Sequence, residues 1–336
     1  MNLSPAIIIV TRQTRLQGLR ERWVTDDQAK FRLKQSRAIE TQRRRETRKA
    51  RGQTSALLAP EAAPEAEFDE YVAEDRTYQA TLQQLKHELE FGLPVKIIDR
   101  SYVPNFDFYN AAVVVVVGQD GLVANTAKYA QGLPIVGVNP DPRRIDGVLL
   151  PFQVQQTRTI VKRVLDRAAK TRPVTLAEVQ LNDGQKLLAF NDFFIGCSSH
   201  VSARYTLEVG GASEAQSSSG ILVSTGAGST GWLSSVFNMA RGVAALMEVP
   251  PPPAMRLEWE DRRLAWVVRE PFASRHSQAN LVAGILAEGH ELVVESLMPA
   301  NGVIFSDGIE SDFLTFASGT IARLKASEQR AQLVVG

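Results

Sequence analysis

Five consecutive valines, Val113 to Val117, are the feature that most constrains how this chain of 336 residues folds. An apolar run bounded by glycine is typical of a strand buried on both faces, as in parallel sheets covered by helices. The run leads into the turn Gly118-Gln119-Asp120-Gly121, and residues 122–129 then have helical composition. This order predicts a phosphate site. Glycines have no side chain to block an anion from backbone N–H groups, and the start of a helix attracts negative charge.

Asp120 follows the end of the predicted strand, the edge at which open α/β sheets bind their ligands. A carboxylate beside a phosphate cradle can hold a cation or take a proton, so Asp120 is the candidate catalytic residue. The structural alternative is a helix cap, a role that Asp often has. Neither the P-loop nor the dinucleotide fingerprint is present, so this turn alone does not define a function.

Strands and helices alternate around the valine run. Besides 113–117 we expect strands at 7–10, 95–98 and 134–139, and helices at 75–91, 122–129 and 157–170. Such alternation predicts a parallel sheet covered by helices.

Beyond residue 171 the pattern changes to short apolar runs separated by Asn, Asp, Gly and Ser. Many short strands with turn signals are typical of a sandwich-like β domain. We expect one helix within 229–247 and strands at 174–181, 186–195, 204–209, 220–224, 255–259, 264–268, 291–295, 302–305 and 313–317.

The expected division is an α/β nucleotide-binding domain over 1–155, a β-rich domain over 156–320, and a segment over 321–336 that returns to the first domain. The first domain carries a charged insertion over residues 12–90.

The insertion separates its charges along the sequence. Residues 12–51 carry fourteen Arg and Lys against five acids, and residues 52–75 carry seven acids and no base. Scattered apolar residues predict amphipathic helix in the basic part, whereas the acidic part is expected to be a linker. Without regular aromatic interleaving we interpret the insertion as a solvated arm that pairs with itself, not a nucleic-acid surface. We therefore expect it to be dispensable for chemistry.

Composition limits the class of protein. Apolar residues make up 44% of the chain, charged residues 22%, and the net charge is +1, which gives no global reason to expect nucleic acid or an acidic membrane. No segment approaches the ~20 apolar residues of a membrane span, and the run at 6–10 is too short for a signal peptide. Cys197 has no partner for an intrachain disulfide, and the four histidines lack metal-ligand spacing. We expect a cytoplasmic protein with no resident metal.

Two later segments carry polar groups suited to a nucleotide. Residues 224–232 place a glycine- and hydroxyl-rich loop before a helix capped by Ser229 or Thr230, which suits a phosphate-bearing ligand but also fits a flexible linker. The pair Asn191-Asp192 lies between two apolar runs. A carboxamide can pair with an adenine edge, and a carboxylate can accept from ribose hydroxyls. A bulge or a buried turn is the structural alternative for this pair.

In this order and at this separation, the three segments resemble the fingerprints of the NAD kinase family. That family has a Gly-Gly-Asp-Gly turn after a valine-rich strand, an Asn-Glu pair and a Ser-Thr-Pro-Thr-Gly-Ser-Thr-Ala-Tyr loop. The matching segments here are 118–121, 191–192 and 224–232, and the resemblance covers roughly residues 95–320. It implies an α/β fold with an N-terminal Rossmann-like domain and a C-terminal β-sandwich-like domain, as in diacylglycerol-type kinases.

The resemblance implies transfer of the γ-phosphoryl of ATP to the 2′-hydroxyl of the adenosine ribose of NAD, giving NADP. Asp120 would activate that hydroxyl, and Mg²⁺ would arrive with the nucleotide. The ATP phosphates would lie at Gly118, Gln119 and Gly121. NAD would be bound by Asn191, Asp192, Thr230, Gly231 and Ser235. Asp307, in an Asp-Gly pair, is a weaker candidate for lining the site. We also expect a homo-oligomer, either a dimer or a tetramer.

The sequence departs from the family pattern at three places. Gln119 replaces a glycine, Asp192 is one methylene shorter than Glu, and Gly226 and Gly231 replace Pro and Ala. The last change predicts a looser substrate loop. Two other functions stay open: a lipid or other small-alcohol kinase of the same superfamily, and a non-catalytic nucleotide-binding regulator, which Gln119 favours.

Overall fold

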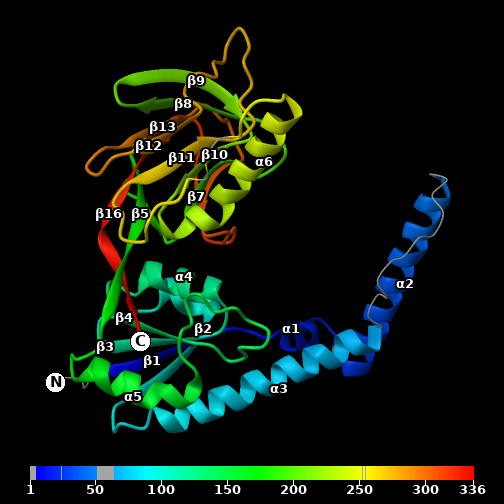
Figure 1. Ribbon diagram of the computed structural model, residues 1–336, viewed down its shortest axis with the longest axis vertical. Coiled ribbons are helices and arrows are strands. Elements are labelled where there is room, and N and C mark those ends of the chain that lie inside the picture. Colours follow the sequence, from blue (N-terminus) through cyan, green and yellow to red (C-terminus); the bar gives the residue numbers. More distant parts are fainter. Residues whose placement is uncertain (1–4, 24, 51–63, 252, 254) are drawn as a thin grey trace.

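A computed structural model describes residues 5–336 except 24, 51–63, 252 and 254. Figure 1 shows two halves stacked along the long axis, a parallel sheet with its helices below and a β-sandwich above, with a helical arm at the side. Within the described residues, no helix is both long and apolar enough to cross a membrane.

The lower half is built on four parallel strands. Their order is β2 (Val95–Asp99), β1 (Ala6–Thr11), β3 (Ala111–Val117) and β4 (Pro134–Val138). The five valines of β3 have no exposed surface. Alternate valines face opposite layers: one contains α3 (Pro64–Glu88) and α5 (Val154–Leu165), and the other contains η1 (Arg100–Asn105) and α4 (Asp120–Tyr129). The predicted doubly covered parallel sheet is confirmed.

Two long antiparallel strands, β5 (Thr171–Leu181) and β16 (Ile321–Val334), connect the halves. The end of β16 pairs in parallel with β4, while its beginning pairs with β13 (Leu292–Ser296), so one ten-stranded sheet runs through both halves. The expected boundary between residues 155 and 156 falls inside α5, which packs on the parallel sheet. We therefore propose a boundary just before β5, with β16 shared by both domains.

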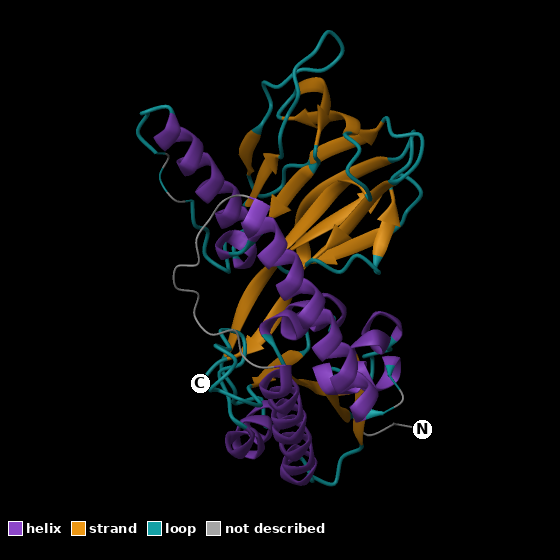
Figure 2. Ribbon diagram, turned by 90° about the vertical axis from the view of Figure 1, so that its right-hand side faces the viewer, coloured by secondary structure: helices purple, strands orange, loops and turns teal. Residues whose placement is uncertain are grey.

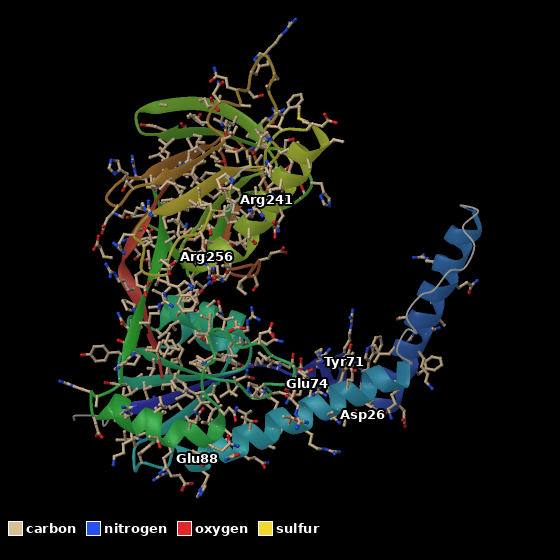
Figure 3. The ribbon with its side chains drawn as sticks, viewed as in Figure 1. Asp26, Tyr71, Glu74, Glu88, Arg241 and Arg256 are labelled. Atoms are coloured by element: carbon tan, nitrogen blue, oxygen red, sulfur yellow. The ribbon has the colours of Figure 1, made fainter. Side chains whose placement is uncertain are left out.

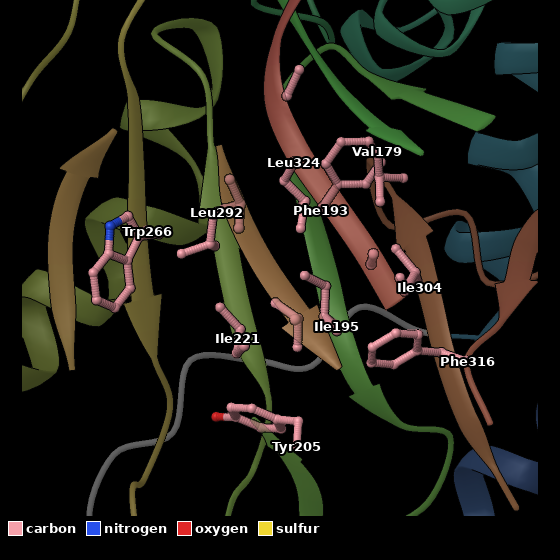
Figure 4. Packing of buried hydrophobic residues seen from close by; sticks show 14 of the residues in the cluster. Val179, Phe193, Ile195, Tyr205, Ile221, Trp266, Leu292, Ile304, Phe316 and Leu324 are labelled. Atoms are coloured by element: carbon pink, nitrogen blue, oxygen red, sulfur yellow. The ribbon is translucent and has the colours of Figure 1, made fainter. Parts of the chain in front are cut away.

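The upper half is a sandwich of two antiparallel layers, as predicted. The ten-stranded sheet contributes β5, β6 (Lys186–Ala189), β8 (Ala203–Val209), β9 (Ala212–Ser218), β13 and β16. The opposing sheet has the order β12 (Ala283–Leu286), β11 (Leu264–Val268), β10 (Ile221–Ser224), β7 (Asp192–Cys197), β14 (Gly302–Ser306) and β15 (Phe313–Thr315). Figure 4 shows the core between them, with Ile195 and Ile221 of one layer near Leu292 and Leu324 of the other.

Two expected strands differ in the structure. The run 186–195 is divided into β6 and β7, which belong to different sheets, so the chain crosses between layers at residues 190 and 191. The strand expected at 255–259 is wrong: these residues form a loop and a turn. Leu257 is buried against α6 (Trp232–Leu246), so its apolar character serves helix packing and not strand pairing.

The arm contains α1 (Arg15–Arg22), α2 (Asp26–Ala50) and the first half of α3, and it leaves the sheet at the carboxyl end of β1. Leu16, Ala29 and Phe68 form its small core. Because α3 begins at Pro64, residues 64–75 are helix, and the expected linker is wrong there; residues 52–63 lie outside the described part of the chain. Proline is favoured at a first helical position. Figure 1 shows α2 rising at the side to the height of the sandwich, and in the turned view of Figure 2 the arm lies in front of the rest of the molecule.

Candidate functional site

The glycine turn joins β3 to α4 at the carboxyl edge of the parallel sheet. Gly118 is buried, and an added Cβ there would lie 2.9 Å from Leu122 Cδ2. Gly121 is exposed, and no atom lies within 4 Å of the position that a Cβ would take. Gln119 is the N-cap of α4 but makes no capping bond with its side chain. The turn therefore offers an open helix start next to an uncovered glycine, which suits an anion.

Asp120 is the first residue of α4 and is half-buried. Its Oδ1 accepts a hydrogen bond from the backbone N–H of Leu149 at 2.6 Å, so its side chain holds the loop between β4 and α5 and does not cap its own helix. Among the described residues, the other carboxylate oxygen has no hydrogen-bond partner. One oxygen is thus fixed and the other remains able to accept a proton or hold a cation.

Asn191-Asp192 forms a turn whose backbone is held from two sides. Asp307 accepts hydrogen bonds from the N–H groups of Asn191 at 2.6 Å, Phe190 at 3.1 Å and Asp192 at 3.4 Å. Thr225 donates its N–H to the Asn191 carbonyl at 2.8 Å and its hydroxyl to the Phe190 carbonyl at 2.5 Å. The Asn191 side chain makes no hydrogen bond within the described residues, so its amide is available to a ligand.

Asp192 is 6% exposed, and its backbone N–H lies 3.4 Å from Oδ1 of Asp307. Burial, followed by repulsion from Asp307, raises the pKa of Asp192 to about 7. Near neutral pH this group exists in both protonation states, so it can donate a hydrogen bond to a ribose hydroxyl as well as accept one.

Lys128, at the end of α4, ties this turn to the lower half. Its Nζ donates to Ser306 Oγ at 2.8 Å and lies 3.6 Å from Asp307 Oδ2, with both charged side chains almost fully buried. Burial lowers the pKa of Lys128 and raises that of Asp307, while their mutual attraction opposes both shifts. The neighbouring Tyr129 donates to Asp312.

Sequence reasoning missed Lys128 and gave Asp307 only a minor place. Their partners lie more than a hundred residues away in the chain, so no local spacing could have found the pair.

The glycine–hydroxyl loop is packed more tightly than expected. An added Cβ at Gly226 would lie 1.8 Å from the Glu258 carbonyl oxygen, and one at Gly228 would lie 2.1 Å from the Asn191 carbonyl oxygen. Ser229 donates to the Gly226 carbonyl at 2.7 Å. The expectation of a looser loop is therefore wrong at Gly226, where only glycine fits against a neighbouring backbone.

The predicted helix cap in this loop is also wrong. Ser229 and Thr230 belong to η2 (Ala227–Thr230), and the N-cap of α6 is Gly231, which makes no side-chain capping bond. Thr230, Gly231 and Ser235 are exposed at the start of α6. Within the described residues their side chains make no hydrogen bond to Asn191 or Asp192, so these three positions are open to a ligand but are not tied to that turn.

An aromatic cavity of about 560 Å³ adjoins these residues on the outer face of the second sheet. Phe194 stacks on Trp232 with ring centroids 5.8 Å apart and contacts Phe305 at 5.0 Å. The guanidinium of Arg269 lies 5.2 Å from the Trp232 ring centre. Flat aromatic walls with a nearby cation suit a base that carries a phosphate.

Helix α4 brings the separate segments together. Phe190 and Ala227, neighbours of the predicted NAD-binding residues, pack in the same cluster as the apolar residues of α4. The helix therefore begins at Asp120, and Lys128 in its last turn lies beside the Asn191-Asp192 turn. At a rise of 1.5 Å per residue, Asp120 and Lys128 lie about 12 Å apart along the helix axis.

The described residues contain no group of three or more His, Cys, Asp or Glu side chains that could hold a metal ion. Four residues of the insertion, Arg12, Arg15, Glu74 and Tyr78, line a cavity together with Gln119. That the insertion is dispensable for chemistry stays a prediction.

The chain is similar in structure to a yeast NADH kinase complexed with NADH, with a TM-score of 0.55 and 14% identity over 100% of this chain and 84% of that chain. It is also similar to an NAD kinase from Archaeoglobus fulgidus in complex with ATP, with a TM-score of 0.51 and 17% identity over 76% of this chain and 89% of that chain. No protein-family model and no curated protein matches the sequence. The fold is thus that of NAD kinases, as the sequence predicted.

Proposed function

We propose that this protein transfers the γ-phosphoryl group of ATP to the 2′-hydroxyl of the adenosine ribose of NAD. The observation that carries the proposal is the placement of α4, which has a glycine turn and a half-free carboxylate at its start and the Asn191-Asp192 turn at its end. A phosphate donor at the first end and a dinucleotide at the second would meet along this helix.

Asp120 is the proposed general base. A ribose hydroxyl is a poor nucleophile at neutral pH, so a fixed carboxylate helps by accepting its proton as the phosphoryl group moves. The bond from Leu149 N–H orients this carboxylate without using its second oxygen. Gly118, Gln119 and Gly121 would surround the phosphates at the start of α4.

Asn191 and Asp192 are the proposed contacts to NAD, with Thr230, Gly231 and Ser235 lining the same substrate. Three observations support these contacts: the Asn191 amide makes no hydrogen bond within the described residues, the Asp192 carboxyl titrates near neutral pH, and the start of α6 is exposed. The aromatic cavity beside Trp232 offers a stacking surface for one of the two bases.

The residues present fit a Mg²⁺ ion carried by the donor and not one held in a protein cage. Mg²⁺ in phosphotransfer sites takes one or two carboxylates and the phosphate oxygens. Because the second oxygen of Asp120 is assigned to the ribose proton, the ion would be held mainly by phosphate oxygens and water. When bound, the ion would neutralise phosphate charge.

The single cysteine and the use of ATP and NAD support a cytoplasmic location. A homo-oligomer stays a prediction, which light scattering on the purified protein would check.

The test is a panel of acceptors with γ-labelled ATP and Mg²⁺. We expect label to appear on NAD or NADH but not on diacylglycerol or small alcohols. Label on a lipid or small alcohol alone would favour the other kinase of this superfamily. NAD binding without any turnover would favour the regulatory function.

A further inference from the structure

A second cavity lies beside the glycine turn, on the side of the arm. It has a volume of about 270 Å³, and Gln119 of the turn forms part of its wall. The arm contributes Arg12, Arg15 and Glu74, and the loop after β4 contributes Asp141 and Arg144. Three arginines around one small cavity next to a helix start make an environment for a highly charged anion.

The arm is attached rigidly at this place. The buried Tyr78 of α3 donates its hydroxyl to the carbonyl of Val117, the last residue of β3, and accepts the N–H of Arg12, both at 2.9 Å. Thr14 caps α1 through a capping box with Gln17. The backbone that carries Arg12 and Arg15 is therefore fixed relative to the Gly118 turn.

The arginines are only partly neutralised by the protein. Glu74 is shared, accepting from Arg12 Nη2 at 2.8 Å and from Arg15 Nε at 2.5 Å, and Arg144 Nη1 lies 3.3 Å from Asp141. Three guanidinium groups thus face two carboxylates. In addition, the Nε of Arg12 is buried and has no acceptor among the residues that the structure describes. A buried charged N–H without an acceptor is unfavourable, and a ligand oxygen would supply that acceptor.

We propose that this cavity binds the polyphosphate chain of the phosphate donor, with Arg12 and Arg15 of the insertion and Arg144 as its cations. The inference deepens the proposed function and rests on it for the identity of the donor as a nucleoside triphosphate. Guanidinium groups match phosphate oxygens with two parallel N–H donors. The insertion is then part of the donor site and not a dispensable arm.

The competing explanation is that Arg12, Glu74 and Arg15 only fasten the arm to the body. Figure 3 shows Glu74 on the part of α3 that lies along α1. A fastening role predicts that loss of Glu74 harms the protein as much as loss of an arginine. A binding role predicts that loss of Glu74 frees the arginines for phosphate.

The experiment measures binding of inorganic tripolyphosphate to the full-length protein by calorimetry. Arg15→Gln is the main variant, because the Arg15 side chain is 51% exposed and its loss should leave the fold intact. Arg144→Gln tests the opposite wall. Arg22→Gln, on the same helix but outside the cavity, is the matched control.

We expect Arg15→Gln and Arg144→Gln each to weaken tripolyphosphate binding about tenfold or more, as for a lost hydrogen bond to a charged group. Arg22→Gln should bind like the wild type, and Glu74→Gln should bind at least as tightly. Equal binding by the wild type, Arg15→Gln and Arg144→Gln would overturn the inference, as would weaker binding by Glu74→Gln with its melting temperature unchanged.

Activity separates this inference from the proposed function. If the protein makes NADP and Arg15→Gln leaves the KM for ATP unchanged, the cavity is not the donor site although the function stands. If tripolyphosphate binding depends on Arg15 and Arg144 but no NADP is formed, the phosphate site stands and the proposed function fails.

Discussion

The two turns that meet α4 are shaped in opposite ways. The Gly118 turn gets its form from a strand–helix junction and from glycines, and one side-chain bond, from Asp120, ties it to another loop. The Asn191-Asp192 turn is fixed by a buried carboxylate, two carbonyl contacts and a buried lysine. The first keeps its amides for a ligand, whereas the second uses them inside the protein. Substitutions should therefore change chemistry at the first turn and stability at the second.

The largest effect is expected for Asp120→Asn at the first turn. The amide oxygen can still accept from Leu149 N–H, but the side chain can no longer take a proton. General bases are typically worth ~10²–10⁴-fold in rate, so kcat should fall at least a hundredfold. The melting temperature and the KM for NAD should change little. A lower melting temperature with turnover per folded molecule preserved would make Asp120 only a loop tether.

Asp307→Ala tests the second turn. It leaves the buried Lys128 ammonium without its ion-pair partner and three N–H groups without the Asp307 carboxylate as acceptor. Breaking a buried ion pair in this way destabilises by about 3–5 kcal/mol, which chemical denaturation would measure. Asp146→Ala, at an exposed position, is the control. The double variant Lys128→Met/Asp307→Ala should recover part of the loss, and strictly additive effects would contradict the coupling of the pair.

Asp192→Asn should remove a pH dependence of stability. The pKa of Asp192 is raised from 3.8 to about 7, so the folded state binds more protons than the unfolded chain between these values. This group therefore lowers the free energy of unfolding as pH rises from about 4 to about 7, by at most a few kcal/mol. Denaturation at several pH values should show the variant losing less stability over this window. If the wild type and the variant have parallel pH profiles, the pKa of Asp192 is the same in the folded and the unfolded protein.

A pair of glycine substitutions compares the two loops directly. Gly226→Ala puts a methyl group against the Glu258 carbonyl and should destabilise by about 1–3 kcal/mol. Gly121→Ala has open space, so the melting temperature should hold while the KM for ATP rises, because a methyl group would stand where the phosphate approaches. If Gly121→Ala leaves the KM for ATP unchanged, the turn does not receive the donor.

The smallest effect is expected for Asn191→Ala. Its backbone is held by Asp307 and Thr225, so the turn should survive the loss of the side chain. Losing one hydrogen bond to a neutral ligand group costs about 0.5–1.5 kcal/mol, or a few-fold to tenfold in the KM for NAD. The KM for ATP should stay the same. The reverse pattern in steady-state kinetics would mean that the two halves of the site are exchanged.

Local sequence signals were enough to predict the strand, turn and helix around Gly118 and the architecture of both halves of the fold. The valine run, the glycines after it and the change to short runs beyond residue 171 predicted the parallel sheet and the sandwich. Local pattern was misleading where apolar residues pack on helices. The apolar residues around Leu257 suggested a strand, but Leu257 packs on α6. The acidic residues around Phe68 suggested a linker, but Phe68 is part of a helix and packs in the core of the arm.

The parts of the site that sequence could not give depend on distant contacts. Asp307 meets the Asn191 turn across more than a hundred residues, and Arg12 meets Glu74 through the folding of the insertion. A buried carboxylate and an exposed one cannot be told apart in a sequence. Only tertiary packing excludes water from such a group and brings its charged partner into contact with it.

The most direct measurement of the central claim is a timed incubation of the purified protein with NAD, γ-labelled ATP and Mg²⁺, followed by separation of the dinucleotides. We expect labelled NADP in excess of the amount of protein, formed at least a hundredfold more slowly by Asp120→Asn. Unlabelled NAD recovered intact from a folded protein that binds both nucleotides would contradict it.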